Sequence, residues 1–268
     1  MLQKFFNLFR FYGLILLVAI AGCSTTSERD STAGWSAERI YQRAKSHLSA
    51  RNFDEAIEFY ELLEARFPYG RYAQQAQIEV AYAHFRNEDP ELAIEAIDRF
   101  MRMYPNHSNL DYAYYLKGLI FFPEDRNLTS NILVLDMSDR DPKAAFESFN
   151  NFKILVERFP NSPYAEDAAF RMRHLRNMLA LHETHVARYY YRRGAFLAAA
   201  NRAQAAIQNY PDTPAVEEAL FLLAESYREM QKDELKESAL AVLKKNYPDS
   251  PYLRGEDPNK RPWWKIWY

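Results

Sequence analysis

Apolar residues recur along most of this chain at the three- and four-residue spacing of an amphipathic helix. The clearest run lies in residues 53–63, where one apolar stripe faces away from a row of glutamates. The stripe consists of Phe53, Ala56, Ile57, Tyr60 and Leu63. Residues 93–104 repeat the arrangement. Such spacing predicts helices that pack one face against a core and leave the other in solvent.

An aromatic residue followed by proline closes each helical run. The pairs are Phe67-Pro68, Tyr104-Pro105, Phe159-Pro160, Tyr210-Pro211 and Tyr247-Pro248. Proline has no amide hydrogen and disfavours the helical conformation in the residue before it, so a helix ends at such a pair. Five pairs therefore predict five structural units.

A small residue marks the first helix of each unit. It lies 24 positions before the proline in four units, and a glycine takes its place in the third. These residues are Ala44, Ala81, Gly118, Ala187 and Ala224. Small side chains let two antiparallel helices cross closely. Pro68 and Pro105 are 37 residues apart, near the tetratricopeptide period. We therefore predict an all-α fold, a tetratricopeptide-repeat solenoid of five helix-turn-helix repeats.

Two units depart from the regular length. The third has 18 additional residues between its two helices, around residues 122–140, and a loop of that length indicates either function or disorder. The fourth has no proline or glycine from Ala165 to Arg193, which predicts one unusually long helix ended by Gly194. At the start of the first unit, Ser36 is the predicted N-cap.

The first 22 residues have the composition of a secretory signal. Lys4 and Arg10 precede an apolar run that is about half the ~20 residues a membrane-spanning helix needs. The run ends in small residues before Cys23, the only cysteine, and resembles the cleavage site of bacterial lipoproteins. We expect diacylglycerol and an N-acyl chain on Cys23, with no other cofactor. The alternative is an ordinary signal followed by an incidental cysteine.

The residues after Cys23 indicate where such a lipoprotein would reside. Ser24 follows the cysteine where an aspartate would otherwise direct retention, and the resemblance to sorted lipoproteins implies the outer membrane. Residues 23–35 are largely polar and are expected to form a lipidated tether.

Charge and composition exclude several function classes. The chain has 34 basic and 36 acidic side chains, which gives no bulk attraction for nucleic acid. His182 and His185 are three residues apart rather than the four of a zinc-protease helix, and no third ligand is evident. There is also no glycine-rich phosphate loop. We therefore expect neither an enzyme nor a metal site.

The first helices of a repeat array line its concave groove. If the small residue is the eighth position of each unit, the fifth, ninth and twelfth positions face that groove. In the first three units these are Tyr41, Lys45, Leu48, Ile78, Tyr82, Phe85, Tyr115, Leu119 and Phe122. The surface is largely aromatic and suits an extended peptide with aromatic side chains. The alternative is that some of these residues pack against the long loop of the third unit.

Arginines are concentrated in the fourth unit. Between residues 171 and 202 there are seven of them, against Glu183 as the one acid. They are Arg171, Arg173, Arg176, Arg188, Arg192, Arg193 and Arg202. Guanidinium groups pair bidentately with carboxylates, so this excess favours an acidic protein partner. The alternative is a solvated helix face neutralised by acids elsewhere in the chain.

The last residues, 254–268, do not continue the repeat. Five apolar residues alternate there with three cations. They are Trp263, Trp264, Ile266, Trp267 and Tyr268, with Lys260, Arg261 and Lys265. Tryptophan and tyrosine prefer interfaces, so contact with lipid headgroups or another subunit is expected, and a disordered tail is the alternative.

Four local strings resemble the BamD (ComL) family, lipoproteins of the machinery that inserts β-barrel proteins into the outer membrane. The strings are Arg66 to Tyr72, Ala96 to Phe100, Ser138 to Pro142, and Tyr189 to Ala195 running on to Asn201-Arg202. The resemblance covers about residues 23–252, and the last string is the most specific.

The resemblance implies a non-enzymatic scaffold, lipid-anchored at the periplasmic face of the outer membrane. It implies three kinds of protein partner: a POTRA domain of the barrel subunit BamA, other lipoproteins of the BAM complex, and unfolded outer-membrane barrel proteins. Residues 36–160 would receive the aromatic C-terminal signal of the barrel proteins, and residues 161–253 would bind BamA.

The same resemblance assigns roles to individual residues. Arg193 and Arg202 match family arginines on the BamA-facing side, where Arg188 and Arg192 accompany them. Phe67 and Tyr69 fall in the motif near the substrate side. Phe67 stands where relatives can have tyrosine, so a role that needs a hydroxyl there is in doubt.

Two other function classes stay open at this point. A periplasmic tetratricopeptide adaptor for cell-wall synthesis or division would keep the repeats without needing the string from Arg193 to Arg202. A lipoprotein enzyme would need a polar catalytic cluster, which the sequence does not show.

Overall fold

The computed structural model describes residues 32–123 and 142–256, and within these ranges the regular structure is helical. The helices are α2 (Ala37–Ser49), α3 (Phe53–Arg66), α4 (Arg71–Arg86), α5 (Pro90–Met103), α6 (Leu110–Phe121), α7 (Lys143–Arg158), α8 (Ala165–Arg192), α9 (Phe196–Asn209), α10 (Ala215–Glu229), α11 (Asp233–Asn246) and the 3-10 turn η2 (Pro251–Arg254). The predictions on Cys23, on residues 124–141 and on most of the tail lie outside the described residues.

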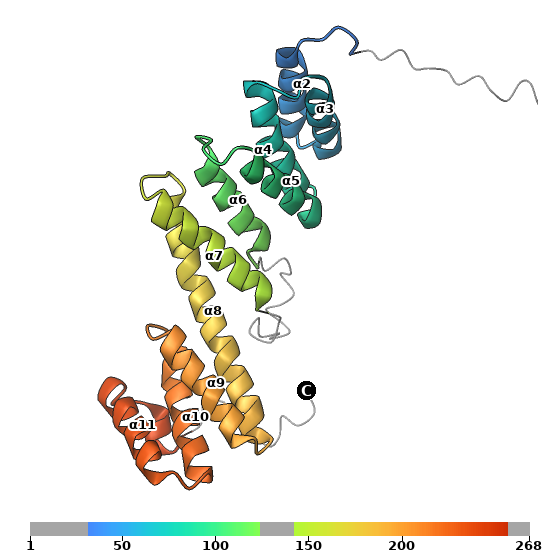
Figure 1. Cartoon of the computed structure of the whole chain (residues 1–268). Coiled ribbons are helices and arrows are strands. Elements are labelled where there is room, and N and C mark those ends of the chain that lie inside the picture. The colour runs from blue at the N-terminus through green and yellow to red at the C-terminus, as the bar shows by residue number, and fades with distance from the viewer. Residues whose placement is uncertain (1–31, 124–141, 257–268) are drawn as a thin grey trace, which may run out of the picture.

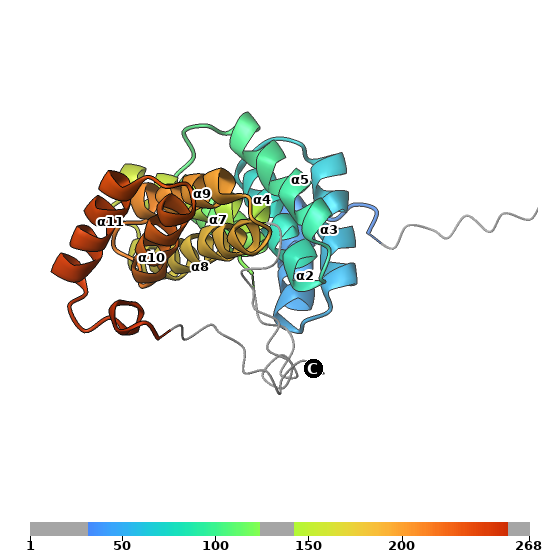
Figure 2. The same cartoon turned by 90° about the horizontal axis from the view of Figure 1, so that it is seen from below.

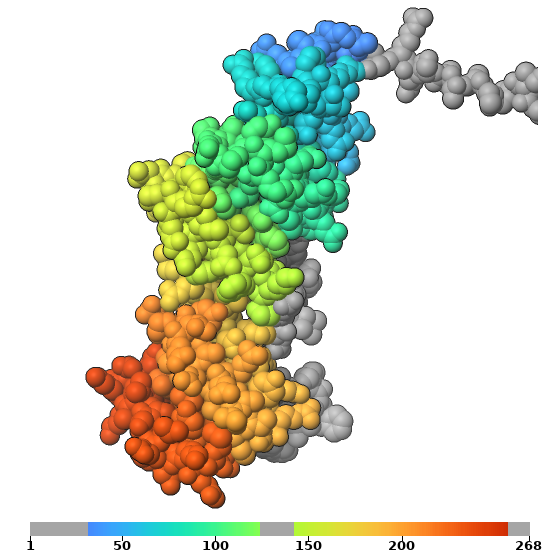
Figure 3. Space-filling view, viewed as in Figure 1, coloured from blue at the N-terminus to red at the C-terminus, as the bar shows by residue number. Residues whose placement is uncertain are grey.

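The helices form consecutive antiparallel pairs that stack into an elongated array (Figures 1 and 2). Each helix packs against its chain neighbour, from α2 on α3 to α10 on α11. The space-filling surface is correspondingly long rather than round (Figure 3). The five pairs confirm the predicted all-α solenoid of helix-turn-helix repeats.

The aromatic-proline pairs end helices as predicted. Phe67, Tyr104, Phe159, Tyr210 and Tyr247 are the C-cap residues of α3, α5, α7, α9 and α11. The amide of each aromatic residue donates to the carbonyl four residues earlier, at 2.8–3.0 Å. The proline that follows cannot make the next bond of this kind, so the helix stops. At the opposite end of the first unit, the Ser36 hydroxyl accepts from the Arg39 amide at 3.2 Å, which confirms the predicted N-cap.

The small residues lie where paired helices cross. Ala44, Ala81, Ala187 and Ala224 are all fully buried. At Gly118 a β-carbon would come within 2.4 Å of the Phe152 ring on α7, so even alanine is too large at this crossing. The spacing read from the sequence therefore identified the contact points between helices.

The long helix α8 links two core clusters. It has 28 residues and ends before Gly194, whose φ of 74° is a left-handed conformation that glycine adopts readily. Leu175 lies in a cluster with α6 and α7, whereas Ala187 lies in a cluster with α9, α10 and α11. One helix therefore carries the chain from one half of the stack to the other.

No helix in the described ranges combines the length and the apolar character needed to cross a bilayer.

Candidate functional site

A groove opens between the first helices of the first three units. Its volume is about 520 Å³, and residues of α2, α4 and the start of α6 meet there with the turn before α8. We call it the A-helix groove, where helix A is the first helix of each unit. Its walls include Leu48, Gln75, Glu79, Tyr82, Tyr112 and Tyr164. The concave surface expected of the repeat array is therefore present, and it is lined with tyrosine rings.

A hydrogen-bond network centred on Glu79 holds one wall of this groove. The Tyr41 hydroxyl donates to Oε1 at 2.8 Å, and Gln75 Nε2 donates to the same oxygen at 3.0 Å. The Tyr60 hydroxyl donates to Oε2. Burial, and then the bond to this carboxylate, raise the pKa of the Tyr41 phenol, and burial with the nearby negative charge of Glu79 raises that of Tyr60. The carboxylate is thus tied to α2 and α3 as well as to its own helix.

The charged side chains that line the A-helix groove are acidic. Glu79 and Asp111 line it, and no lysine or arginine does so among the described residues. Asn109 Nδ2 donates to Gln75 Oε1 at 3.3 Å, which links α4 to the turn before α6. This arrangement offers aromatic faces and hydrogen-bond acceptors, which suit the side chains and backbone amides of a peptide.

Three predicted groove residues, Leu48, Ile78 and Tyr82, line the groove, and one lies behind it. Ile78 and Tyr82 are on its wall, although Ile78 is only 1% exposed. Tyr41 is 7% exposed, with its ring against Tyr60 and Tyr72. The expectation that Tyr41 faces the groove is therefore not met, because its hydroxyl turns inward to reach Glu79.

The other predicted residues lie around the groove. Phe85 and Phe67 are half-buried and pack on the N-terminal core, with Phe67 as the cap of α3. Tyr69 is 89% exposed in the turn before α4. Tyr115 stacks on Tyr164 at 4.8 Å between ring centroids, and its hydroxyl donates to Asp167 of α8 at 2.7 Å.

The repeat numbering missed eight of the eleven lining residues: Gln75 and Glu79 lie on α4 itself, and the other six lie at the start of α6 or in the turns before α6 and α8. Asn109, Asp111 and Tyr112 belong to the entry of the third unit, and Tyr164 to the turn before α8. These positions precede the first helix or open it, whereas the repeat rule considers only its middle. The sequence signal that could have found Tyr164 is the string Pro163-Tyr164, which begins three residues after Pro160 of the third aromatic-proline pair.

The buried tyrosines predict a loss of stability at alkaline pH. Burial raises the pKa of Tyr41, Tyr60 and Tyr112 in the folded chain, whereas unfolded tyrosine titrates near 10. Above about pH 10 the unfolded chain binds fewer protons, so the free energy of unfolding should fall as pH rises. Urea unfolding at several pH values measures this slope. Tyr60→Phe should flatten it and Tyr69→Phe, at an exposed position, should not; a slope unchanged by Tyr60→Phe would contradict the explanation.

Acids of neighbouring segments neutralise much of the arginine excess. Arg188 of α8 is bound to Glu218 of α10 at 2.5 Å, and both side chains are less than one fifth exposed. Arg176 pairs with Asp212 at 3.2 Å. A third pair joins Arg171 to an acid of its own helix, Asp167, at 2.6 Å. For these arginines the alternative of intramolecular neutralisation holds.

Three of the remaining four arginines lie on either side of the turn between α8 and α9, whereas Arg173 lies in the first half of α8 beside the Phe170 ring. Arg192 and Arg193 are exposed, and the Arg193 guanidinium lies 5.4 Å from the centre of the Tyr189 ring. Arg202 of α9 pairs with Glu183 at 3.2 Å, yet its side chain is 47% exposed. We call Arg192, Arg193, Arg202 and the exposed Tyr189 and Leu197 the arginine surface. It combines cations with apolar area, as protein-binding surfaces commonly do.

Metal-binding side chains do not gather in groups of three or more within residues 32–123 and 142–256. His182 and His185 lie on α8. The A-helix groove and the arginine surface are the candidate sites, because both have the chemistry of protein binding.

Comparison with known proteins gives a consistent family. The model of the YfiO family, described as outer membrane lipoprotein, matches residues 34–243. A protein of Neisseria gonorrhoeae named outer membrane protein assembly factor BamD is 43% identical over 256 residues, which cover 94% of this chain and 96% of the relative. Proteins of the same name are 37% identical in Xylella fastidiosa (93% of this chain, 85% of the relative) and 38% identical in Vibrio cholerae (81% and 90%).

Proposed function

The chain belongs to the YfiO family of outer membrane lipoproteins, which BamD relatives represent, and from this premise we propose that it is a non-enzymatic scaffold for assembling β-barrel proteins into the outer membrane. The observation that carries the proposal is similarity over nearly the full length of relatives named as assembly factors. The two surfaces support it, because their aromatic rings, acceptors and arginines suit proteins as ligands.

The membrane end of the scaffold is Cys23. The family is one of outer membrane lipoproteins, and Cys23 is the only cysteine and follows the signal-like segment. We propose that the lipid on Cys23 anchors the chain and that the residues after it act as the tether. The last four residues of the predicted tether, 32–35, instead pack on the first repeat, where the Thr32 carbonyl accepts from Arg66 at 2.8 Å and Trp35 stacks on Phe59. Within the described residues the first helix begins at Ala37, so the repeats would start close to the membrane surface.

The substrate side of the scaffold is residues 36–160. The A-helix groove lies between the first helices of the first three units, and the rings of Tyr82, Tyr112 and Tyr164 line it. Aromatic side chains of an unfolded barrel protein can stack on such rings, and backbone amides can donate to Glu79 and Asp111. Tyr69 and Phe67 belong to this side, with Tyr69 free to contact a ligand beyond the groove.

The BamA side of the scaffold is residues 161–253. The arginine surface supports this assignment, because Arg192 and Arg193 are exposed and Arg202 keeps half of its side chain in solvent. A POTRA domain that presents carboxylates would pair with these guanidinium groups. Arg188 is held by Glu218 and would act by positioning α8 rather than by direct contact.

A pull-down from detergent-solubilised outer membranes tests the proposal. The tagged full-length lipoprotein is expected to recover BamA together with other lipoproteins of the BAM complex. Recovery of cell-wall synthases without BamA would instead support the tetratricopeptide adaptor and would overturn the assembly role. The matched control is the same protein after high-salt washing, since a contact built on arginine pairs weakens with ionic strength.

A further inference from the structure

The last helix of the stack leaves an apolar face without a following repeat. In the inner units the second helix packs against the first helix of the next unit, as α3 does on α4 and α9 does on α10. Among the described residues, α11 is followed only by the short turn η2. It buries Ala239 and Leu243, whereas Ala241 of the same helix is exposed and Leu253 of η2 is 36% exposed. Apolar surface at the end of a solenoid normally requires a cap.

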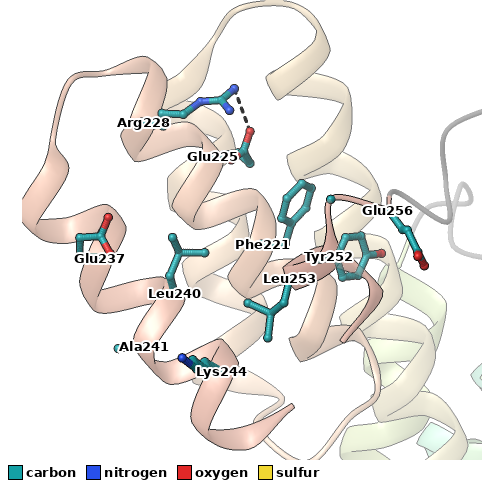
Figure 4. Close-up of a pocket in the computed structure, with 11 residues that line it drawn as sticks. Phe221, Glu225, Arg228, Glu237, Leu240, Ala241, Lys244, Tyr252, Leu253 and Glu256 are labelled. Carbon is teal, nitrogen blue, oxygen red and sulfur yellow. Dashed lines mark ion pairs between the residues drawn. The ribbon is translucent and has the colours of Figure 1, made fainter. Parts of the chain in front are cut away.

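A cavity of about 730 Å³ lies at this uncapped end, between α10, α11 and η2 (Figure 4). We call it the end groove. Phe221, Leu240, Ala241 and Leu253 give it an apolar lining, and Tyr252 stacks on Phe221 at 4.7 Å between ring centroids. The volume is in the range that holds a compact ligand or several large side chains.

The charged residues of the end groove are mostly acidic. Glu225, Glu237 and Glu256 line it, against Arg228 and Lys244. The Arg228 guanidinium is already paired with Glu225 at 2.8 Å and with Glu229 at 2.7 Å. Glu237 and Glu256 are paired as well, with Lys236 at 3.0 Å and with Arg254 at 3.1 Å. The lining has one more acid than cations, so charge gives only a small preference for a positively charged apolar ligand.

We propose that residues 257–268 of the same chain dock in the end groove and cap the solenoid. Glu256 is itself part of the groove lining, and the sequence continues from it with the tail. Trp263 is seven residues after Glu256, and seven fully extended residues span at most about 25 Å. A ligand tethered this closely has a very high effective concentration, so it outcompetes other chains for the groove.

The composition of the tail fits the groove. Three tryptophans supply large apolar area for the lining, and three cations face the acidic residues. Before them, Asp257-Pro258-Asn259 has the residue order of a tight turn, which would reverse the chain toward α11. The proposal does not depend on the assembly role, since it concerns the end of the repeat array alone.

Tryptophan fluorescence tests this docking directly. The chain has four tryptophans, and Trp35→Phe leaves Trp263, Trp264 and Trp267 as the only ones. The full-length lipidated protein with this substitution, held in lipid nanodiscs, is expected to show short-wavelength emission that acrylamide quenches poorly. Ala241→Arg then blocks the groove from an exposed position of α11, adding bulk and a charge that repels the tail cations. The emission should move to longer wavelength, and the protection from acrylamide should be lost.

The matched control is Val242→Arg, which adds the same group at the next residue, where the side chain is exposed and does not line the groove. This variant should keep the emission and the protection of the parent. Tryptophans that are freely quenched in the parent would overturn the proposal, because the tail would then be free. Protection that survives both substitutions would overturn it as well, because the tail would then lie in the lipid surface or on another site.

Discussion

Gly118→Ala is expected to lower the free energy of unfolding by roughly 1–3 kcal/mol, the usual cost of adding a methyl group to a packed crossing. The new β-carbon would lie 2.4–2.8 Å from three ring carbons of Phe152. Phe152 is fully buried, so its ring has no free space into which to turn. The Gly118 carbonyl also accepts from the buried Ser148 hydroxyl at 2.8 Å, so separating α6 from α7 would stretch a buried hydrogen bond. Thermal or urea unfolding of the purified protein measures the change.

A second substitution separates crowding from other effects of losing glycine. Phe152→Leu shortens the opposing side chain and should, by itself, destabilise the protein through the cavity it leaves. Combined with Gly118→Ala it should cost less than the sum of the two single changes, because the methyl group then has space. Additive costs would show that the close approach of Gly118 to Phe152 is not what limits this position.

Arg202→Glu is expected to weaken binding to the BamA POTRA region by about 2–5 kcal/mol, as charge reversal at an interface pair does. Arg202 is not fully desolvated in the free chain: it is half exposed and already paired with Glu183. The new glutamate would repel Glu183 as well as any carboxylate of the partner. Titration of the POTRA region against the purified lipoprotein measures the affinity.

Two control variants distinguish the partner contact from the internal pair. Arg176→Glu reverses a pair of the same length, 3.2 Å to Asp212, outside the arginine surface, and should leave binding unchanged. Exchange of the charges in Glu183→Arg with Arg202→Glu should restore the internal pair but not the affinity. If the exchange restores binding, Arg202 serves only to fix α9 against α8, and its assignment as a contact residue fails.

Features encoded within one repeat could be predicted from the sequence. The aromatic-proline pairs ended helices because proline acts on its immediate neighbours. The same holds for the absence of proline and glycine that gave the 28-residue helix α8. The alanines and Gly118 lay at helix crossings because the repeat fixes their position within each pair.

Features that depend on two repeats could not be predicted in the same way. Tyr41 was expected in the groove, yet its hydroxyl finds Glu79, which is 38 residues later in the chain. The arginines of α8 looked unbalanced because Asp212 and Glu218 lie outside the segment that was counted, 36 and 30 residues from their partners. Only packing of separate units decides which side chains these groups meet.

The continuity of α8 has a consequence for how the two binding sides communicate. At 1.5 Å per residue its 28 residues span about 42 Å, and each residue rotates the direction of the next side chain by about 100°. No break interrupts α8 between the core cluster around Leu175 and the one around Ala187, so the length of the helix fixes the distance between these clusters. Its length sets both the separation and the relative orientation of the A-helix groove and the arginine surface, so under the proposed function a barrel protein bound at one end would be held at a set distance from BamA at the other.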